Sequence, residues 1–300
     1  MTASEIIDRH VNIAETQKTW LKWRRLLGKA LLTLVLLGFT LFVIIPFIWM
    51  IILSLRSTMG ILTNPYGLPN PPRWDNYVEL MIDPQIRFYR YFGNSTFVSV
   101  FALALNSAIA LLAGYGFGRS RYDFNGRALL YAVLLFALML PPQIMYIPQF
   151  TMMSRYGLLN SRWALVFLYA ARQLPVSTYL MATYFSQLPS ELEDAARIDG
   201  CSDFRTFWCV MLPLARPALA TVILLNFMFF WNELLLAVTM VTNPELRTLP
   251  AAMMMFVGEH GSDYAMAATS LVTSAAPIVI LYLFLSERFI EGMTAGAVKG

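Results

Sequence analysis

Charged residues are scarce in this chain. Only 13% of its 300 residues are Asp, Glu, Lys or Arg, and 58% are hydrophobic, whereas about a quarter of the residues are charged in an ordinary soluble domain. Because a soluble domain of this size must cover itself with charge, most of this surface is expected to face something other than water. The composition favours a polytopic membrane protein with one compact helical domain.

Cysteine and histidine are also rare, with two of each: Cys201, Cys209, His10 and His260. Neither pair has zinc-site spacing with partners nearby, so no metal site is expected. No His-centred acid–base set supports the alternative of a membrane enzyme. The sequence lacks a Gly-x-x-x-x-Gly-Lys-Ser/Thr phosphate loop, so we expect no ATP binding of that kind by this chain. The scattered basic residues, with a net charge of +4, indicate no nucleic-acid partner.

Long apolar runs are what the sequence does have. About 20 consecutive apolar residues suffice for a helix to cross a bilayer, and six runs qualify: residues 30–53, 95–118, 128–148, 163–185, 218–242 and 264–285. None shows the alternation over about ten residues that is typical of a barrel strand. The first run is too long for a signal peptide and is followed by no small-residue cleavage site. The sequence therefore predicts an all-α, polytopic transmembrane bundle of six spans with an uncleaved first span.

The distribution of basic residues predicts the orientation. If the N-terminus is inside the cell, 14 of the 22 Lys and Arg residues fall in cytoplasmic segments and seven in outer segments, while Arg172 lies inside the fourth span. This bias places both termini in the cytoplasm. We expect a basic N-terminal arm (1–29), a membrane domain (30–285) with a cytoplasmic loop at 189–217, and a cytoplasmic tail (286–300).

The loop between the fourth and fifth predicted spans has the signals of a rigid helix–turn–helix. Ser190 and Glu193 have the spacing of a capping box, in which the hydroxyl and the carboxylate satisfy free N–H groups at a helix start. Gly200 is suited to the left-handed turn that ends this helix. Asp203 or Ser202 then caps a second short helix. These signals alone would also fit an ordinary amphipathic surface loop.

The spacing within this loop is more informative. An acidic residue and two alanines are followed by a glycine four residues on and by Leu-Pro twelve residues beyond it. This pattern resembles the EAA loop of ATP-binding-cassette (ABC) importer permeases, with Asp194 where Glu is usual and Cys201 where a small residue is common. The resemblance implies that the loop couples the chain to a separate ATPase through Glu191, Asp194, Ala195, Ala196, Asp199, Gly200, Leu212 and Pro213.

Further motifs resemble the carbohydrate branch of these permeases, of the maltose-transporter type. They are Asn94-Ser95, the turn from Gly114-Tyr115 to Arg121, Trp231-Asn232-Glu233, Arg247-Thr248-Leu249-Pro250 and the tail 294–300. The resemblance implies the type I ABC importer permease fold in a bacterial inner membrane. It also implies a sister permease, two ATPase subunits that bind ATP and Mg, and an extracytoplasmic solute-binding protein that delivers a carbohydrate. Residues 296–300 of the tail are expected to reach the ATPase, and residues 243–263 to contact the binding protein.

Polar side chains inside spans are costly against lipid and usually face a cavity. They are therefore candidates for a substrate path, together with neighbouring aromatic faces that suit sugars. The candidates are Gln143, Arg172, Gln173, Asn226, Trp231, Asn232 and Glu233, with Asn106 as a further polar group. For each of them a helix-to-helix hydrogen bond is an equally good interpretation, and Glu233 is equally suited to an internal salt bridge with Arg172.

Arg172 is the most informative of these residues. It lies near the middle of its span, just before Pro175, where the carbohydrate-permease pattern is apolar. Because a guanidinium can hold a carboxylate or phosphate through two bonds, we hypothesise that Arg172 faces the pore and attracts an anionic oligosaccharide; structural pairing is the alternative. A permease for another small polar solute, such as a glycerol phosphate, stays open. An ion-coupled secondary transporter is less favoured, because we find no inverted repeat and Glu233 alone among acids and histidines lies clearly within a predicted span.

Overall fold

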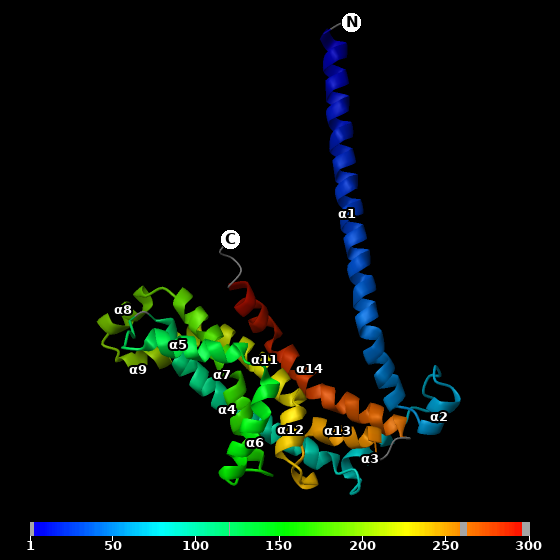
Figure 1. Ribbon diagram of the computed structural model, residues 1–300. Coiled ribbons are helices and arrows are strands. Elements are labelled where there is room, and N and C mark those ends of the chain that lie inside the picture. Colours follow the sequence, from blue (N-terminus) through cyan, green and yellow to red (C-terminus); the bar gives the residue numbers. More distant parts are fainter. Residues whose placement is uncertain (1–2, 120, 259–262, 296–300) are drawn as a thin grey trace.

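The computed structural model describes residues 3–119, 121–258 and 263–295, and within these ranges every regular element is a helix. Figure 1 shows a long first helix that extends away from a body formed by the remaining helices. The all-helical prediction is confirmed. The expected contact of the tail with the ATPase concerns residues 296–300, which lie outside the described residues.

Helix α1 (Ala3–Ser54) runs without interruption through the segment predicted as an arm and through the first predicted span. None of the apolar window in its Trp23–Ser54 segment is buried by the rest of the chain. Its C-terminal end joins the body, where Thr269 Oγ1 donates a hydrogen bond of 3.2 Å to Ser54 O. Two short helices follow at this end, α2 (Thr58–Thr63) and α3 (Asp75–Ile82).

Four helices form the centre of the body: α4 (Phe88–Gly118), α7 (Arg162–Gln187), α11 (Arg216–Asn232) and α14 (Tyr264–Ala295). Helices α4 and α7 approach each other very closely at Gly114 and Gly118. A Cβ atom built on Gly114 would lie 2.4 Å from Met181 Cβ, and one on Gly118 would lie 2.5 Å from the carbonyl oxygen of Ala182. Such a small-residue pair allows two membrane helices to pack backbone against backbone.

A buried polar network also joins three of these helices. The amide nitrogen of Asn226 on α11 donates to Asn106 Oδ1 on α4 and to Ser177 Oγ on α7, both at 2.8 Å. Asn106 Nδ2 in turn donates to Ala170 O at 2.8 Å. Because Asn106 and Asn226 are almost fully buried, these bonds satisfy polar groups that would otherwise be costly.

The third predicted span is not one continuous helix. It is divided into α5 (Arg127–Phe136), η1 (Ala137–Met139), η2 (Pro142–Met145) and α6 (Tyr146–Arg155), and the two halves meet at 102°. Pro141 and Pro142 lie at the break, and because proline has no N–H group the helical hydrogen-bond ladder is interrupted there.

The fifth predicted span is also divided, into α11 and α12 (Leu235–Met240). A Glu233 carboxylate oxygen accepts a hydrogen bond of 2.8 Å from the backbone nitrogen of Leu236, which starts a new helix after α11 has ended at Asn232. The expectation of one helix over 218–242 was wrong for this reason.

Three helices in the described part of the chain are long and apolar enough to cross a membrane, or five if each of two bent pairs is one span. The second bent pair joins Asp203–Leu214 to α11 at 72°. The fourth predicted span forms α7, whose 26 residues are long enough to cross. Arg172 and Gln173 in its middle lower its hydropathy, and so it falls outside that count.

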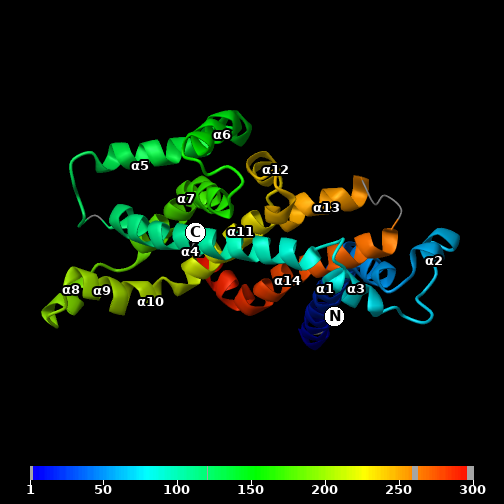
Figure 2. The same ribbon diagram turned by 90° about the horizontal axis from the view of Figure 1, so that it is seen from below.

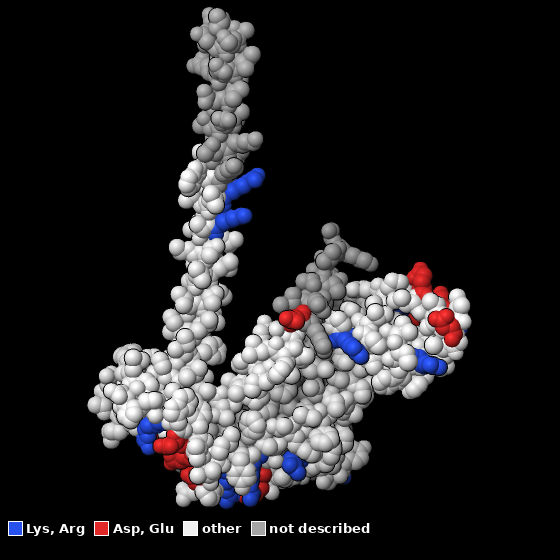
Figure 3. Space-filling view, turned by 180° about the vertical axis from the view of Figure 1, so that it is seen from behind, with Lys and Arg blue, Asp and Glu red and all other residues white. Residues whose placement is uncertain are grey.

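The opposite ends of the body differ in composition. Figures 1 and 2 place α8 and α9 at the end remote from α2. On the face seen in Figure 3, charged side chains gather along one edge of the body and at the opposite end that carries α8 and α9, and a broad uncharged surface lies between these two groups. At the end that carries α2, Asn94 Nδ2 donates to the carbonyl oxygens of Glu245 and Arg247, both at 3.0 Å. These bonds fasten η4 (Pro244–Leu246) and the start of α13 (Leu249–Gly258) to α4.

Candidate coupling loop and translocation pocket

The predicted coupling loop is a set of short helices. They are α8 (Glu191–Ile198), α9 (Asp203–Thr206), a π-helical turn η3 (Phe207–Met211) and α10 (Leu212–Leu214). The predicted turn at Gly200 is confirmed, because this residue has a φ of +81°, which a residue with a Cβ atom rarely adopts. Ser202 Oγ accepts a hydrogen bond of 3.4 Å from Arg205 N and caps α9, as predicted.

The predicted capping box is wrong. Ser190 has helical backbone angles and makes no side-chain cap bond. The carboxylate of Glu193 does not reach back to the helix start, because its two oxygens are bound elsewhere. Tyr115 Oη donates to one oxygen at 2.6 Å, while Arg119 Nε and Nη2 donate to the other at 2.9 and 2.5 Å. A tertiary partner has therefore taken the carboxylate that the local pattern assigned to a cap.

Arg119 connects three helices at this point. It is the C-cap residue of α4, and its Nη1 donates to the carbonyl oxygens of Phe185 and Leu188 at 3.1 and 2.6 Å, at the C-terminal end of α7. A cation at a helix C-terminus and a carboxylate in the first turn of the next helix both complement the helix dipoles. Arg119 is 6% exposed and Glu193 3%, so this ion pair is buried.

Aromatic rings enclose the ion pair. Tyr115 lies 5.3 Å from Phe185 and 5.1 Å from Phe207, measured between ring centroids. Tyr122 Oη donates to Tyr115 Oη at 3.3 Å. Burial raises the pKa of the Tyr122 phenol above its ordinary value, so this hydroxyl keeps its proton. In this dry environment the attraction between the guanidinium and the carboxylate is stronger than at the surface.

Five of the predicted coupling residues lie exposed on α8 and the turn after it: Glu191, Asp194, Ala195, Asp199 and Gly200. Ala196 faces inward with 6% exposure, and Leu212 and Pro213 are half-buried. Three large apolar side chains that we did not single out from the sequence, Ile198, Phe204 and Trp208, are 88%, 71% and 50% exposed at the same end. Their signal was present in the sequence as apolar residues within an otherwise acidic and polar loop.

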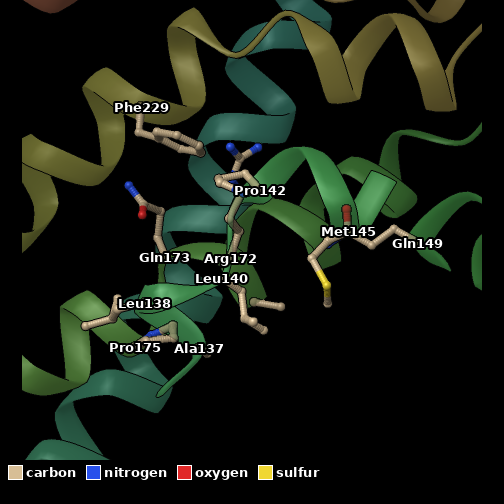
Figure 4. Close-up of a pocket in the computed structure, with 11 residues that line it drawn as sticks. Ala137, Leu138, Leu140, Pro142, Met145, Gln149, Arg172, Gln173, Pro175 and Phe229 are labelled. Carbon is tan, nitrogen blue, oxygen red and sulfur yellow. The ribbon is translucent and has the colours of Figure 1, made fainter. Parts of the chain in front are cut away.

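A cavity of about 420 Å³ lies among η1, η2, α6, α7 and α11. Figure 4 shows the side chains of Arg172 and Gln173 from α7 directed toward Phe229 of α11. The cavity is lined by Ala137, Leu138, Leu140, Pro142, Met145, Gln149, Ala171, Arg172, Gln173, Pro175 and Phe229. Two predicted path residues, Arg172 and Gln173, are thus brought together. Gln149 and Phe229 were not predicted, because helix rotation decides which side chains face the cavity.

Arg172 is paired but incompletely bonded. Its Nη1 lies 3.6 Å from Glu233 Oε2, which is an ion-pair distance but too long for a good hydrogen bond. The buried Nη1 has no hydrogen-bond partner. The guanidinium also lies 4.9 Å from the centroid of the Phe229 ring and 5.8 Å from that of Tyr146. A buried donor in this state can bind an acceptor that enters the cavity.

The other predicted path residues lie elsewhere. Asn226 is 2% exposed and belongs to the helix-joining network, which corresponds to the structural alternative. Trp231 is 3% exposed and donates through its ring nitrogen to Ser274 O at 2.9 Å, fastening α11 to α14. Asn232 is exposed and bonds within its own helix to Met228 O. Gln143 is exposed on η2 beside the cavity-lining Pro142.

Comparison with known proteins defines the class. The family model described as the binding-protein-dependent transport system inner membrane component matches residues 106–291, and the chain belongs to this family. It is therefore the non-catalytic permease component of an ABC transporter in the inner membrane, and its ATPase is a separate subunit. This confirms the family resemblance of the coupling loop.

Individual relatives cover nearly the whole chain. The trehalose/maltose transport system permease protein MalG of Thermococcus litoralis is 35% identical, over 89% of this chain and 96% of its own length. The sulfoquinovosyl glycerol transport system permease protein SmoH of Agrobacterium fabrum is 32% identical, over 85% and 88%. The crystal structure of a bacterial ABC transporter involved in the import of the acidic polysaccharide alginate contains a chain with the same fold, at a TM-score of 0.75 and 24% identity, over 87% and 96%.

Proposed function

We propose that this chain is one of two non-identical permease subunits of an oligosaccharide importer, and that residues 189–217 couple it to a separate ATPase. Family membership carries this proposal, because the family's transport systems depend on a binding protein. The named relatives that act on sugars or sugar derivatives support a carbohydrate substrate. The exposed acidic and apolar face of α8 and α9 supports docking of a partner protein.

The proposed topology has both termini, α8 and α9 in the cytoplasm and the α2 end of the body outside. The excess of Lys and Arg in the segments assigned to the cytoplasm supports it. The gathering of charge along one edge of the body and at the opposite end agrees with a bilayer around the uncharged surface between them. Cysteines placed singly in residues 64–70 should react with an impermeant thiol reagent in intact cells, whereas native Cys209, which is exposed, should react after lysis.

Coupling to a partner ATPase is tested by purification. A tagged chain should bring down an ATPase subunit and a second permease, and uptake into vesicles should require ATP. Asp194→Lys should weaken retention of the ATPase, because it reverses a charge that is 65% exposed on α8. Uptake that continued in vesicles without ATP, with no ATPase bound to the chain, would overturn this proposal.

We further propose that the cavity beside Arg172 is part of the solute path and that its guanidinium favours an anionic oligosaccharide. The place of Arg172 in the cavity lining and the lack of a hydrogen-bond partner at its Nη1 support this assignment. Glu233 already balances part of the positive charge at 3.6 Å, so the attraction for an anion is that of a loosely paired cation. The sulfoquinovosyl glycerol for which the Agrobacterium fabrum relative is named carries a sulfonate group, which is compatible with this charge.

The substrate charge is tested by uptake of matched neutral and acidic oligosaccharides. Arg172→Gln should reduce uptake of the acidic sugar about tenfold more than that of the neutral one, since a charged hydrogen bond contributes more than that factor. Glu233→Gln keeps an oxygen for Leu236 N but removes the negative charge, so it should favour acidic sugars. Arg162→Gln is the matched control, because Arg162 lies on the same helix but stacks on Phe97 away from the cavity. An equal loss for both sugars in Arg172→Gln would contradict the anionic assignment, and preferential loss of a small phosphate ester would favour that solute class.

A further inference from the structure

A buried charge pair is one of the bonds that fasten the coupling loop to the membrane helices. Among the described residues, two ion pairs join α8 to the end of α4. Arg119 pairs with Glu193, and Arg121, two residues beyond this cap, pairs with Asp194. The second pair spans 3.8 Å between side chains that are 49% and 65% exposed, and surface pairs of this kind contribute little. The first is 2.5 Å long and almost fully buried.

We propose that Arg119 and Glu193 are positioning residues that make α8 and the ends of α4 and α7 move as one body, so that a displacement of the coupling loop by the ATPase reaches the translocation helices. This inference rests on the proposed coupling function and assigns a residue, Glu193, that the loop motif does not single out. Neither residue faces a partner, because both are buried. Their role is to transmit displacement within the chain.

The geometry explains why a movement would be transmitted with little loss. The same guanidinium holds the carboxylate of α8 and two carbonyl oxygens at the end of α7, while it is itself attached to the end of α4. The backbones of α4 and α7 are in direct contact at Gly118, the residue just before Arg119. Tyr115 adds a second bond from α4 to α8. Only three residues, Leu188-Pro189-Ser190, connect α7 to α8. Because the side-chain bonds bridge this connection, it does not act as a hinge.

The cavity lies farther along the same helix. Arg172 and Gln173 belong to α7, about three and a half turns before Phe185 at 3.6 residues per turn, so a rigid displacement of the end of α7 also moves the cavity lining. The Asn106–Asn226–Ser177 bonds join that part of α7 to α4 and α11. The chain of contacts therefore runs without a gap from α8 to the solute path.

The test measures transport per ATP hydrolysed in the complete complex, reconstituted with its binding protein. Glu193→Gln removes the charge at nearly constant volume. The complex should still assemble and hydrolyse ATP, but transport per ATP should fall about tenfold, because a charged hydrogen bond contributes more than that factor. Glu79→Gln is the matched control, since it makes the same substitution at an exposed carboxylate on α3, at the end of the body remote from α8, and leaves the link between α8 and α4 intact; its ratio should equal that of the unmodified complex.

A milder variant guards against loss of folding. Tyr115→Phe removes the hydroxyl bonds with Glu193 and Tyr122 but keeps the ring contacts and the Arg119 bonds to the carboxylate, so it should assemble normally and lower the ratio by a smaller factor than Glu193→Gln does. Equal ratios in all variants, or a parallel fall of hydrolysis and transport, would overturn the positioning role. Failure of the proposed function would show differently, as an unmodified chain that binds no ATPase or transports without ATP.

Discussion

The close approach of α4 and α7 at Gly114 leads to a quantitative prediction. A Cβ atom there would lie 2.4 Å from Met181 Cβ and 3.0 Å from the backbone nitrogen of Ala182. Ordinary carbon contacts are about 3.5 Å or longer, so the helices must separate locally by about 1 Å in Gly114→Ala. Overpacking of this kind costs about 1–3 kcal/mol, while replacing a helical glycine by alanine regains about 0.5–1 kcal/mol. The free energy of unfolding should therefore fall by up to about 2.5 kcal/mol, with a loss of about 1 kcal/mol at the middle of these two ranges.

Gly116 provides the matched control on the same helix. Nothing lies within 4 Å of a Cβ atom at this position, so Gly116→Ala should change stability by the helix-propensity gain alone, up to about 1 kcal/mol. Both variants should be compared in reversible unfolding of the purified chain in mixed detergent and dodecyl sulfate micelles. If Gly114→Ala proved as stable as Gly116→Ala, the two helices would not be in backbone contact at Gly114, and the packing argument would be refuted.

Two further predictions concern hydrogen bonds between distant segments. Asn226→Leu should lower the free energy of unfolding by about 1–2 kcal/mol in the same assay, because two buried interhelical bonds are lost. The control Asn232→Leu should be close to neutral, because the Asn232 amide bonds only within its own helix. Equal effects of the two substitutions would contradict the assigned network. Asn160 has a φ of +56° and accepts three hydrogen bonds from Thr242 and Asn243. Asn160→Ala should therefore be less stable than Asn160→Gly by about 1 kcal/mol, since alanine retains the strain of the left-handed backbone; an equal or reversed order would contradict the assigned backbone strain.

The sequence was most informative where the determining interactions are local. The turn at Gly200 and the cap at Ser202 depend on a few neighbouring residues, and both were predicted correctly. The capping box at Ser190 failed because Glu193 is bound by Arg119, which is 74 residues away in the sequence. Where both a local helix cap and a distant buried guanidinium can bind a carboxylate, its partner cannot be predicted from the neighbouring residues alone.

The same limit applies to the polar residues inside the spans. Asn226 and Arg172 both looked suitable for a solute path, since each is a polar side chain in an apolar run. The rotation of each helix separates them, because Arg172 lines the cavity and Asn226 faces two neighbouring helices. The break at Pro141-Pro142 was visible in the sequence, but counting apolar residues treats proline as one more member of a run. The family, in contrast, was recognisable because the coupling motif preserves residue types at fixed spacings.

The first helix has a thermodynamic consequence. Since none of the apolar window in Trp23–Ser54 is buried by the rest of the chain, this window adds nothing to the packing of the body, which α1 joins near Ser54. Side chains such as Phe39 and Phe42, which are 66% and 76% exposed, depend on surrounding lipid or on a neighbouring subunit for a low-energy environment. The direction of this helix is thus a property of the assembled transporter. A chain synthesised without its partner subunits would expose an apolar helix to the quality-control proteases of the membrane.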